Sequence, residues 1–447
     1  MKIIIAGAHD IGSHLAKLLS KNNHDIVLMD EDEDRLDSIS PDYDLLTMHA
    51  SPSSLKALKE AGAESADLYI AVTPDESKNM NSCVMAKAIG TKKTVAKVDN
   101  YEFVEPELAN FFEGLGIDSL IYPENLAAND IVNGLKMSWV RQRLDVHGGA
   151  LVMLGVKLRE TCEILDQPLK ELCKPDSPYY IVAIRRDGDT IIPRGDDSLK
   201  VYDMAYFMTT KQYIPYVRKI VGKEHYVDVK NVMIMGAGNT AVRALENMPE
   251  YMNVKVIEHD EERCEQLNEQ IDNSNVMVIN GDGRDLSLLN EEGIHNTQAF
   301  VALTSNAETN ILACLTAKRM GVRKTVAAVE NLDYVNMAVS LDIGTIINKK
   351  AIAASHIYQM MLDTEVSNVS FLMTANAHVA EFVAQPQSKV TRKKVYELGL
   401  PKGATIGGLV RNGEGYLVSG GTQIEAGDIV VVFCYNQRMD KLEKFFK

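Results

Sequence analysis

The sequence predicts an α/β protein in which two large parallel-sheet domains are each followed by a small α+β domain. Two observations carry this prediction. The 447-residue chain repeats itself at an offset of about 229 residues. Within each repeat, short apolar runs first alternate with helical stretches and then give way to a β-rich segment. The expected order of domains is therefore large, small, large, small.

The repeat is clearest in two segments of the large domains. Residues 3–12, IIIAGAHDIG, match residues 232–241, VMIMGAGNTA, and residues 93–100, KTVAKVDN, match residues 324–331, KTVAAVEN. The small domains repeat as well, because RRDG at 185–188 matches VRNG at 410–413. One fused module has therefore been duplicated.

Each large domain opens with strands separated by helices. In the first copy we expect strands near 2–6, 26–30, 44–48, 68–72 and 94–98, which together indicate a parallel sheet with helices on both faces. The segments near 148–222 and 372–447 are β-rich instead. The turn pairs Asp187-Gly188 and Asn412-Gly413 divide them into hairpins.

The domain boundaries follow from these changes of character. We place the first large domain at 1–125, with a connecting helix to about residue 145, and the first small domain at 146–224. The second large domain spans 229–350, with a connecting helix to about residue 366, and the second small domain spans 367–447. The expected connecting helices, Leu126–Leu144 and Ile352–Leu362, have apolar faces that suit either subunit contact or packing within the chain.

Composition excludes several classes of protein. The net charge of −15 argues against a general nucleic-acid binder, which carries a basic face. Six scattered cysteines without a C-x-x-C pair fit free thiols in a reducing cytosol. We expect neither a membrane span nor a signal peptide, because no apolar run is long enough and the N-terminus reads as a strand.

A glycine-rich turn between a strand and a helix forms an anion site from backbone amides. In the second copy Gly236, Gly238 and Ala241 form the pattern G-x-G-x-x-A, and Glu258 ends the next strand. A carboxylate there can accept hydrogen bonds from both ribose hydroxyls of a nucleotide. The pattern predicts a Rossmann-like domain that binds NAD(H) or another adenine nucleotide.

The first copy is less regular. Gly7 and Gly12 are present and Asp30 ends the second strand, but His9 replaces the middle glycine. The histidine either obstructs a pyrophosphate or donates a hydrogen bond to a phosphate. A ribose 2′-phosphate would need a nearby arginine, and Arg35 is the candidate close in sequence. We therefore expect two sites that are not identical.

Other polar positions follow the later strands, at the edge where ligands lie in such folds. Asp282 is placed to accept from an adenine amino group, while the first copy has Met48-His49 in that region. Lys97 can reach a phosphate, and its equivalent in the second copy is Ala328. The fourth strands are followed by Thr73, Pro74, Thr304 and Ser305.

These residues carry a family resemblance. Residues 7–12, Asp30, residues 73–79 and residues 96–100 together resemble the RCK (regulator of potassium conductance) nucleotide-binding domain, and the β-rich halves resemble its companion C-terminal domain. The doubled order is similar to that of the cytosolic regulatory subunits of Trk potassium-uptake systems. The resemblance covers essentially the whole chain.

The resemblance implies a function and a set of site residues. Such proteins bind NAD(H) and ATP or ADP, assemble as a tetrameric ring, and gate a separate integral membrane potassium-translocating subunit (TrkH-like) from the cytoplasmic face of the membrane. The first implied site is Gly7, Ala8, His9, Asp10, Ile11, Asp30, Thr73, Pro74 and Lys97. The second is Gly236, Ala237, Gly238, Asn239, Thr240, Glu258, Asp282, Thr304 and Ser305.

Three alternatives stay open at this point. An NAD-dependent dehydrogenase would need a proton donor beside the nicotinamide, and the small domains offer only isolated histidines, so we expect no enzyme activity. The module can equally regulate a potassium–proton antiporter. The run Asp30–Asp34 suits a divalent cation or a solvated helix start, and Arg185, Arg186 and Arg194 suit an anionic effector or plain surface charge.

Overall fold

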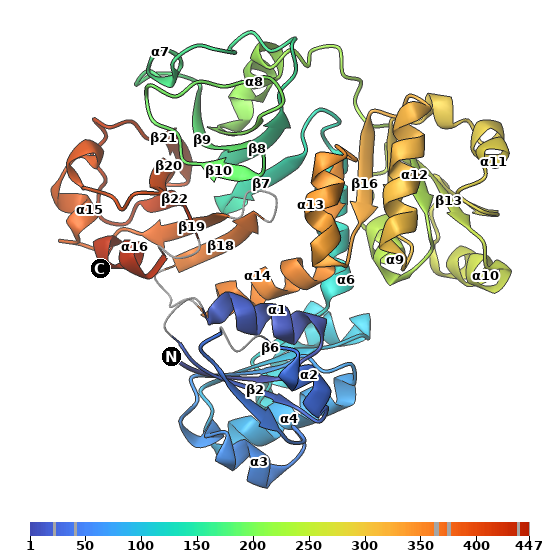
Figure 1. Cartoon of the computed structure of the whole chain (residues 1–447), viewed down its shortest axis with the longest axis vertical. Coiled ribbons are helices and arrows are strands. Elements are labelled where there is room, and N and C mark those ends of the chain that lie inside the picture. The colour runs from blue at the N-terminus through green and yellow to red at the C-terminus, as the bar shows by residue number, and fades with distance from the viewer. Residues whose placement is uncertain (21–23, 40–42, 362–365, 373–376, 436–438, 447) are drawn as a thin grey trace. The chain divides into compact units, whose positions relative to one another are not determined.

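The computed structural model describes residues 1–447 except 21–23, 40–42, 362–365, 373–376, 436–438 and 447 (Figure 1). The chain forms two compact units. One consists of Met1–Leu126 with Lys349–Asp363, and the other of Ala127–Asn348 with Thr364–Lys447.

The first unit contains a six-stranded parallel sheet in the order β3-β2-β1-β4-β5-β6. Ile3, Ile4 and Ile5 in its central strand are completely buried, as expected for a parallel strand with helices on both faces. The strands are β1 (Lys2–Ala6), β2 (Asp25–Asp30), β3 (Leu46–His49), β4 (Leu68–Ala71), β5 (Lys93–Lys97) and β6 (Ser119–Ile121). The helices are α1 (Asp10–Leu19), α2 (Glu33–Asp37), α3 (Leu55–Glu60), α4 (Glu76–Ile89) and α5 (Ala109–Gly114).

A helix from the second half of the chain completes this unit. Helix α14 (Lys349–Met361) packs along α1 (Figure 1). Two ion pairs hold its start, Lys350 Nζ to Asp10 Oδ2 at 2.7 Å and Lys349 Nζ to Glu124 Oε1 at 3.1 Å. The expected second connecting helix is therefore present, and its described part packs within the chain.

The second unit contains a parallel sheet of the same order, β14-β13-β12-β15-β16-β17. The identical order confirms the two Rossmann-like sheets predicted from the repeat. Its strands are β12 (Asn231–Met235), β13 (Asn253–Glu258), β14 (Val276–Asn280), β15 (Ala299–Ala302), β16 (Lys324–Ala328) and β17 (Thr345–Ile347). Its helices are α9 (Asn239–Glu246), α10 (Glu261–Gln270), α11 (Leu286–Glu291), α12 (Ala307–Arg319) and α13 (Leu332–Ser340).

Two five-stranded antiparallel sheets complete the second unit, in the orders β10-β9-β11-β8-β7 and β18-β19-β22-β20-β21. The orders correspond strand for strand, as the repeat predicts. The first sheet comprises β7 (Gln142–Val146), β8 (Leu151–Lys157), β9 (Tyr179–Arg186), β10 (Asp189–Ile191) and β11 (Met204–Thr209), with α7 (Leu169–Leu172) and α8 (Ile214–Ile220). The second comprises β18 (Val366–Leu372), β19 (Ala377–Val383), β20 (Ala404–Arg411), β21 (Glu414–Leu417) and β22 (Ile429–Tyr435), with α15 (Lys389–Arg392) and α16 (Met439–Phe446).

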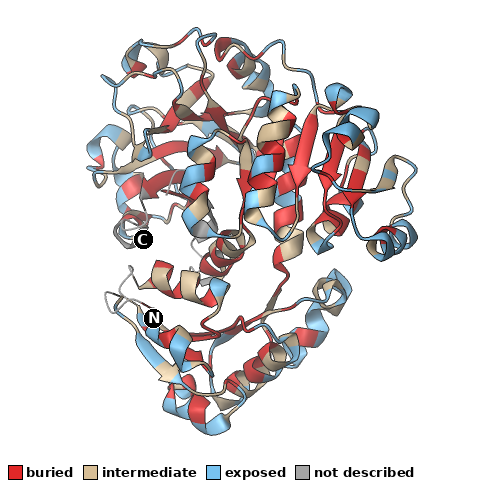
Figure 2. Cartoon of the chain, turned by 45° about the vertical axis from the view of Figure 1, so that its right-hand side comes forward, coloured by how far each residue is buried: buried red, intermediate tan, exposed pale blue. Residues whose placement is uncertain are grey.

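The two small sheets share one hydrophobic core, and Figure 2 shows their strands as largely buried. Tyr206 of one sheet and Phe433 of the other lie with ring centroids 6.2 Å apart. Glycine permits the close approach, because a Cβ added at Gly408 would lie 2.6 Å from Leu151 Cδ1. The two small domains are thus packed against each other through apolar surface.

The first connecting helix is shorter than expected. Helix α6 (Pro123–Leu135) ends nine residues before Leu144, which lies in β7. The prediction of a helix over Leu126–Leu144 is therefore wrong beyond Leu135. Gly134 weakens the helix there, and Trp139 and Val140 are buried in the core of the first small domain instead.

An ion pair with Asp203 accounts for Arg186, one of the arginines considered for an anionic effector. Arg186 Nε and Nη2 donate to the two carboxylate oxygens of Asp203 at 2.8 and 2.7 Å, and Arg411 binds Asp428 with the same distances. Both carboxylates are buried. Because the pair recurs in both copies, Arg186 is a structural residue and not a free cation for an effector. Within the described residues, no helix is long and apolar enough to cross a membrane.

Candidate functional site

The second glycine loop follows β12 and ends at α9. Gly236 has φ +100°, and a Cβ there would lie 3.1 Å from the backbone of Leu303, so only glycine fits the turn comfortably. Gly238 precedes Asn239 and Thr240 of α9 and has no heavy atom within 4 Å of where a Cβ would stand. Its side-chain position is thus open space. That space is the kind of approach path that a pyrophosphate needs.

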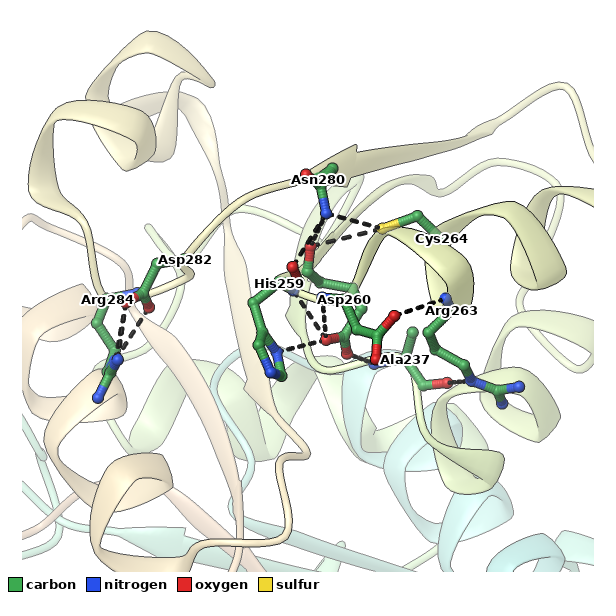
Figure 3. A network of polar contacts seen from close by, with 9 residues as sticks. Ala237, His259, Asp260, Arg263, Cys264, Asn280, Asp282 and Arg284 are labelled. Carbon is green, nitrogen blue, oxygen red and sulfur yellow. Dashed lines mark hydrogen bonds and ion pairs between the residues drawn. The ribbon is translucent and has the colours of Figure 1, made fainter.

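Glu258 links this loop to the end of β13, and Figure 3 labels its partners Ala237, His259 and Asp260. Its Oε2 accepts the Ala237 amide at 2.8 Å, and its Oε1 accepts the amides of His259 and Asp260 at 2.8 and 3.1 Å. His259 Nδ1 lies 2.6 Å from Oε1, on a ring that is largely exposed. Burial raises the pKa of Glu258, but the three amides lower it by more, so the net pKa is below its usual value. The carboxylate is therefore charged at neutral pH.

Two further side chains, which the sequence did not single out, hold the loop and the end of β13 (Figure 3). Arg263 Nε donates to the Ala237 carbonyl at 2.8 Å, and Asn280 Nδ2 donates to the carbonyls of Glu258 and His259, both at 3.2 Å. The sequence could have indicated Arg263 by its position, because it lies in the first turn of α10, directly after the strand that Glu258 ends. These bonds fix the loop and the strand end together.

Asp282 does not join this network. Its carboxylate binds Arg284 Nε and Nη2 at 3.0 and 2.8 Å, and the hydrogen bond from Arg284 is the main reason that the pKa of Asp282 is lowered. Figure 3 shows the Asp282–Arg284 pair lying apart from the contacts that join Ala237, His259 and Asn280. A role for Asp282 toward adenine stays a prediction.

The first copy repeats the carboxylate-to-loop contact. Gly7 has φ +107°, and the Ala8 amide donates to Asp30 Oδ2 at 2.5 Å. Asp30 Oδ1 accepts the Asp32 amide at 2.9 Å and faces Arg35 Nη1 at 3.4 Å. Arg35 is thus beside the acid, as its sequence position suggested.

The helix start in the first copy is tightly packed. A Cβ at Gly12 would lie 1.8 Å from the Gly7 carbonyl oxygen, so glycine is required for the contact between helix and strand. His9 has extended backbone before Asp10 and Ile11 of α1, and its side chain makes no cap hydrogen bond. Since the matching Gly238 borders open space, a histidine side chain fits at this position without steric conflict.

The acidic run after β2 behaves as a helix start. Asp32 accepts the Arg35 amide at 3.2 Å and caps α2, whose first turn holds Glu33 and Asp34. Among the residues that the structure describes, no cluster of histidine, cysteine or carboxylate side chains is suited to a metal ion.

The loops after the fourth strands are fixed by a buried asparagine in each copy. Asn79 Oδ1 accepts from the amide and hydroxyl of Thr73 at 2.9 and 2.7 Å, and its Nδ2 donates to the carbonyls of Thr73 and Lys97, both at 2.9 Å. Asn310 makes the matching bonds to Thr304 and to Ala328. The threonines are thereby held at the carboxyl edge of each sheet.

The remaining predicted residues lie at the same edges. Pro74 and Ser305 are exposed beside the two threonines. Lys97 ends β5, and its Nζ binds Asp99 at 2.6 Å. Because carboxyl ends of parallel strands share one edge, each large domain brings its glycine loop, strand-end acid and threonine loop to one side of its sheet.

Comparison with known proteins gives consistent results. Residues 3–123 and 232–349 match the TrkA-N domain family, and residues 379–447 match the TrkA-C domain family. The Trk system potassium uptake protein TrkA of Halomonas elongata is 31% identical over 454 residues, which cover 100% of this chain and 99% of the relative. A TrkA homolog of Archaeoglobus fulgidus is 28% identical over 448 residues, which cover both chains in full.

Solved structures show the same fold at low identity. The GsuK RCK domain superposes with a TM-score of 0.59 at 15% identity, covering 100% of this chain and 94% of that chain. A structure described as the GsuK channel bound to NAD also gives 0.59 at 15% identity, covering 100% and 78%.

Proposed function

The chain belongs to the TrkA family, and from this premise we propose that it is a cytosolic regulatory subunit that binds nucleotides and gates a membrane potassium-uptake protein. NAD(H) or ATP and ADP are the proposed ligands of the two glycine loops. The proposed assembly is a tetrameric ring on the cytoplasmic face of a TrkH-like membrane subunit.

One observation supports the nucleotide ligand above the others. In both copies a buried strand-end carboxylate, Asp30 or Glu258, hydrogen-bonds to the loop amide that follows the first glycine. The loop amides would hold the phosphates and the acid would hold the ribose. A hydrogen bond already links the acid to the loop in each copy. The NAD described in the GsuK channel is in line with such a ligand.

The two oxygens of Glu258 differ in how many hydrogen bonds they already accept. His259 Nδ1 lies against Glu258 Oε1, which also accepts two amides, whereas Oε2 accepts one. A carboxylate oxygen has two lone pairs, so Oε2 can accept a ribose hydroxyl directly. Both lone pairs of Oε1 already accept backbone amides, so the acid would bind one ribose hydroxyl, through Oε2.

Gating then follows from differential affinity. A nucleotide shifts the subunit between two conformations only by its preference for one of them, and a 100-fold preference supplies about 2.7 kcal/mol. The nucleotide acts as a ligand and is not consumed, so purified protein should not reduce NAD with any small hydroxy acid, alcohol or amino acid.

The experiment is a calorimetric titration of the full chain with NADH, NAD, ATP and ADP. Asp30→Asn and Glu258→Gln should each weaken one class of site by about 10- to 100-fold, since each removes charged hydrogen bonds to ribose. Because the two loops differ at His9 and Gly238, the two losses should be unequal. Absence of binding by the wild type would overturn the proposal, as would an ion flux through the co-purified membrane partner that saturating NADH and ATP leave unchanged.

A further inference from the structure

A buried lysine joins the second parallel sheet to the first small domain. Lys324 starts β16 and its side chain is fully buried. Its Nζ donates to the Val140 carbonyl at 2.6 Å and to Thr345 Oγ1 at 3.1 Å, and Thr345 Oγ1 in turn donates to the Arg141 carbonyl at 2.8 Å. The amine therefore ties β16 and β17 to the segment that enters β7.

The surroundings suit a neutral amine. A neutral amine has two N–H bonds and an ammonium has three, and within the described residues Lys324 Nζ has two acceptors and no carboxylate partner. A buried ammonium without a paired acid is strongly unfavourable.

The acid that pairs with Arg141 is already shared among three cations. Asp342 binds Arg141 Nη2 at 3.1 Å, Arg159 Nη2 at 2.5 Å and Lys318 Nζ at 3.1 Å. Lys157, at the end of β8, adds a further positive charge on the same side of the small domain. The charged group that acts on Lys324 from this domain is the guanidinium of Arg141, which is positive.

In the part of the chain that the structure describes, the other elements packed against Lys324 place no carboxylate in hydrogen-bonding contact with its amine. On α6 a Cβ added at Gly134 would lie 3.9 Å from Nζ. Asp130, one turn earlier, has its pKa raised by burial to about 6, so its charge is nearly constant between pH 7.5 and 8.5. The adjoining strand β15 has no titratable residue. Burial and, secondly, the charge of Arg141 lower the pKa of Lys324 to about 7.

We propose that Lys324 is a proton-sensitive latch: its neutral amine holds the first small domain on the second large domain, and protonation weakens that docking. This regulation is separate from nucleotide binding. An undocked lysine has a pKa of about 10.4, so the undocked state binds the extra proton. Undocking therefore increases as pH falls toward 7, by about eightfold between pH 8.5 and 7.5, and levels off below 7.

The full chain offers an internal reporter. Trp139 is the only tryptophan, is buried, and adjoins Val140. Acrylamide quenching of its fluorescence should rise from pH 8.5 to 7.5 in the wild type. Lys324→Met, which is never charged, should remove this pH dependence, and Lys324→Arg, which is always charged, should be strongly quenched at every pH.

Lys93→Met is the matched control, because Lys93 occupies the equivalent place in β5 and is exposed. It should keep the wild-type pH profile. If quenching of the wild type does not change with pH, the proposal is overturned even if the variants fail to fold. It is also overturned if quenching of Lys324→Met depends on pH as steeply as that of the wild type.

Discussion

Asp342 offers the sharpest test of how the second unit is held together. It stands after α13 with φ +54°, a left-handed conformation that costs a non-glycine residue about 1 kcal/mol. Gly116 occupies the same place in the first copy with φ +93°. Asp342→Gly therefore relieves backbone strain while it removes the carboxylate that Arg141, Arg159 and Lys318 share.

The two effects differ in size. Removing one partner from a buried ionic network costs about 3–5 kcal/mol, which we reduce to about 2–4 kcal/mol because the Asp342 side chain is 30% exposed. Relief of backbone strain in Asp342→Gly adds about 1 kcal/mol to the free energy of unfolding. Part of this gain is cancelled because glycine gives the unfolded chain more conformational entropy. We expect Asp342→Gly and Asp342→Asn to be destabilised by similar amounts.

Urea unfolding followed by Trp139 emission measures this, because that residue lies in the small domain that the network anchors. Both variants should unfold at clearly lower urea concentration than the wild type. If Asp342→Gly were as stable as the wild type or more stable, backbone strain would outweigh the network and our account of this contact would be wrong.

Three other outcomes follow from the site. Because amides hold the pKa of Glu258 below its usual value, its stabilising effect is present above about pH 4.3 and is lost as pH falls through the lowered pKa, so Glu258→Gln should flatten the acid decline of the urea midpoint. His9→Gly should tighten nucleotide binding to the first loop and Gly238→His should weaken it at the second, by about tenfold in calorimetry, with little change in melting temperature. Asn310→Ala should cost about 2–4 kcal/mol in unfolding experiments because it leaves buried backbone groups unpaired, and Asn79→Ala should cost about the same.

The repeat made most of the fold predictable. Once residues 3–12 and 232–241 are aligned, the alternating strands and helices, the glycine loops and the hairpins are expected in both copies, because local sequence specifies each of them. The order of the strands within each sheet comes from the structure. The length of the first connecting helix did not follow. Trp139 and Val140 continue an apolar helical pattern, and only the core of the small domain takes them out of it.

The site was predictable in part for the same reason. The spacing of glycine and acid in the sequence identifies Gly7 with Asp30 and Gly236 with Glu258. In the structure each acid accepts a hydrogen bond from its own glycine loop. Arg263 carries no such signature, because one arginine in an exposed helical turn resembles any other. Whether Pro74, Lys97 or Asp282 contacts a ligand stays a prediction.

Contacts between segments far apart in the sequence could not be predicted. Lys324 lies 184 residues from Val140, and no local pattern indicates that a lysine opening a strand will be buried. Its copy Lys93 has almost the same neighbours in sequence and is exposed. Lys324 is buried because the segment around Val140 packs on the edge of its sheet.

The comparison of the two copies shows how duplication allowed this edge to change. In the first copy Lys87 binds Asp118 within the domain, at 2.8 Å, and glycine fills the left-handed position at 116. In the second copy the acid and the glycine have exchanged places, so that Asp342 takes the strained position and Gly344 the position of Asp118. The exchange keeps the bond to the equivalent lysine, Lys318, and frees the carboxylate to bind two arginines of the small domain. A strained backbone retained at Asp342 where glycine was available is therefore best explained by the docking that it permits.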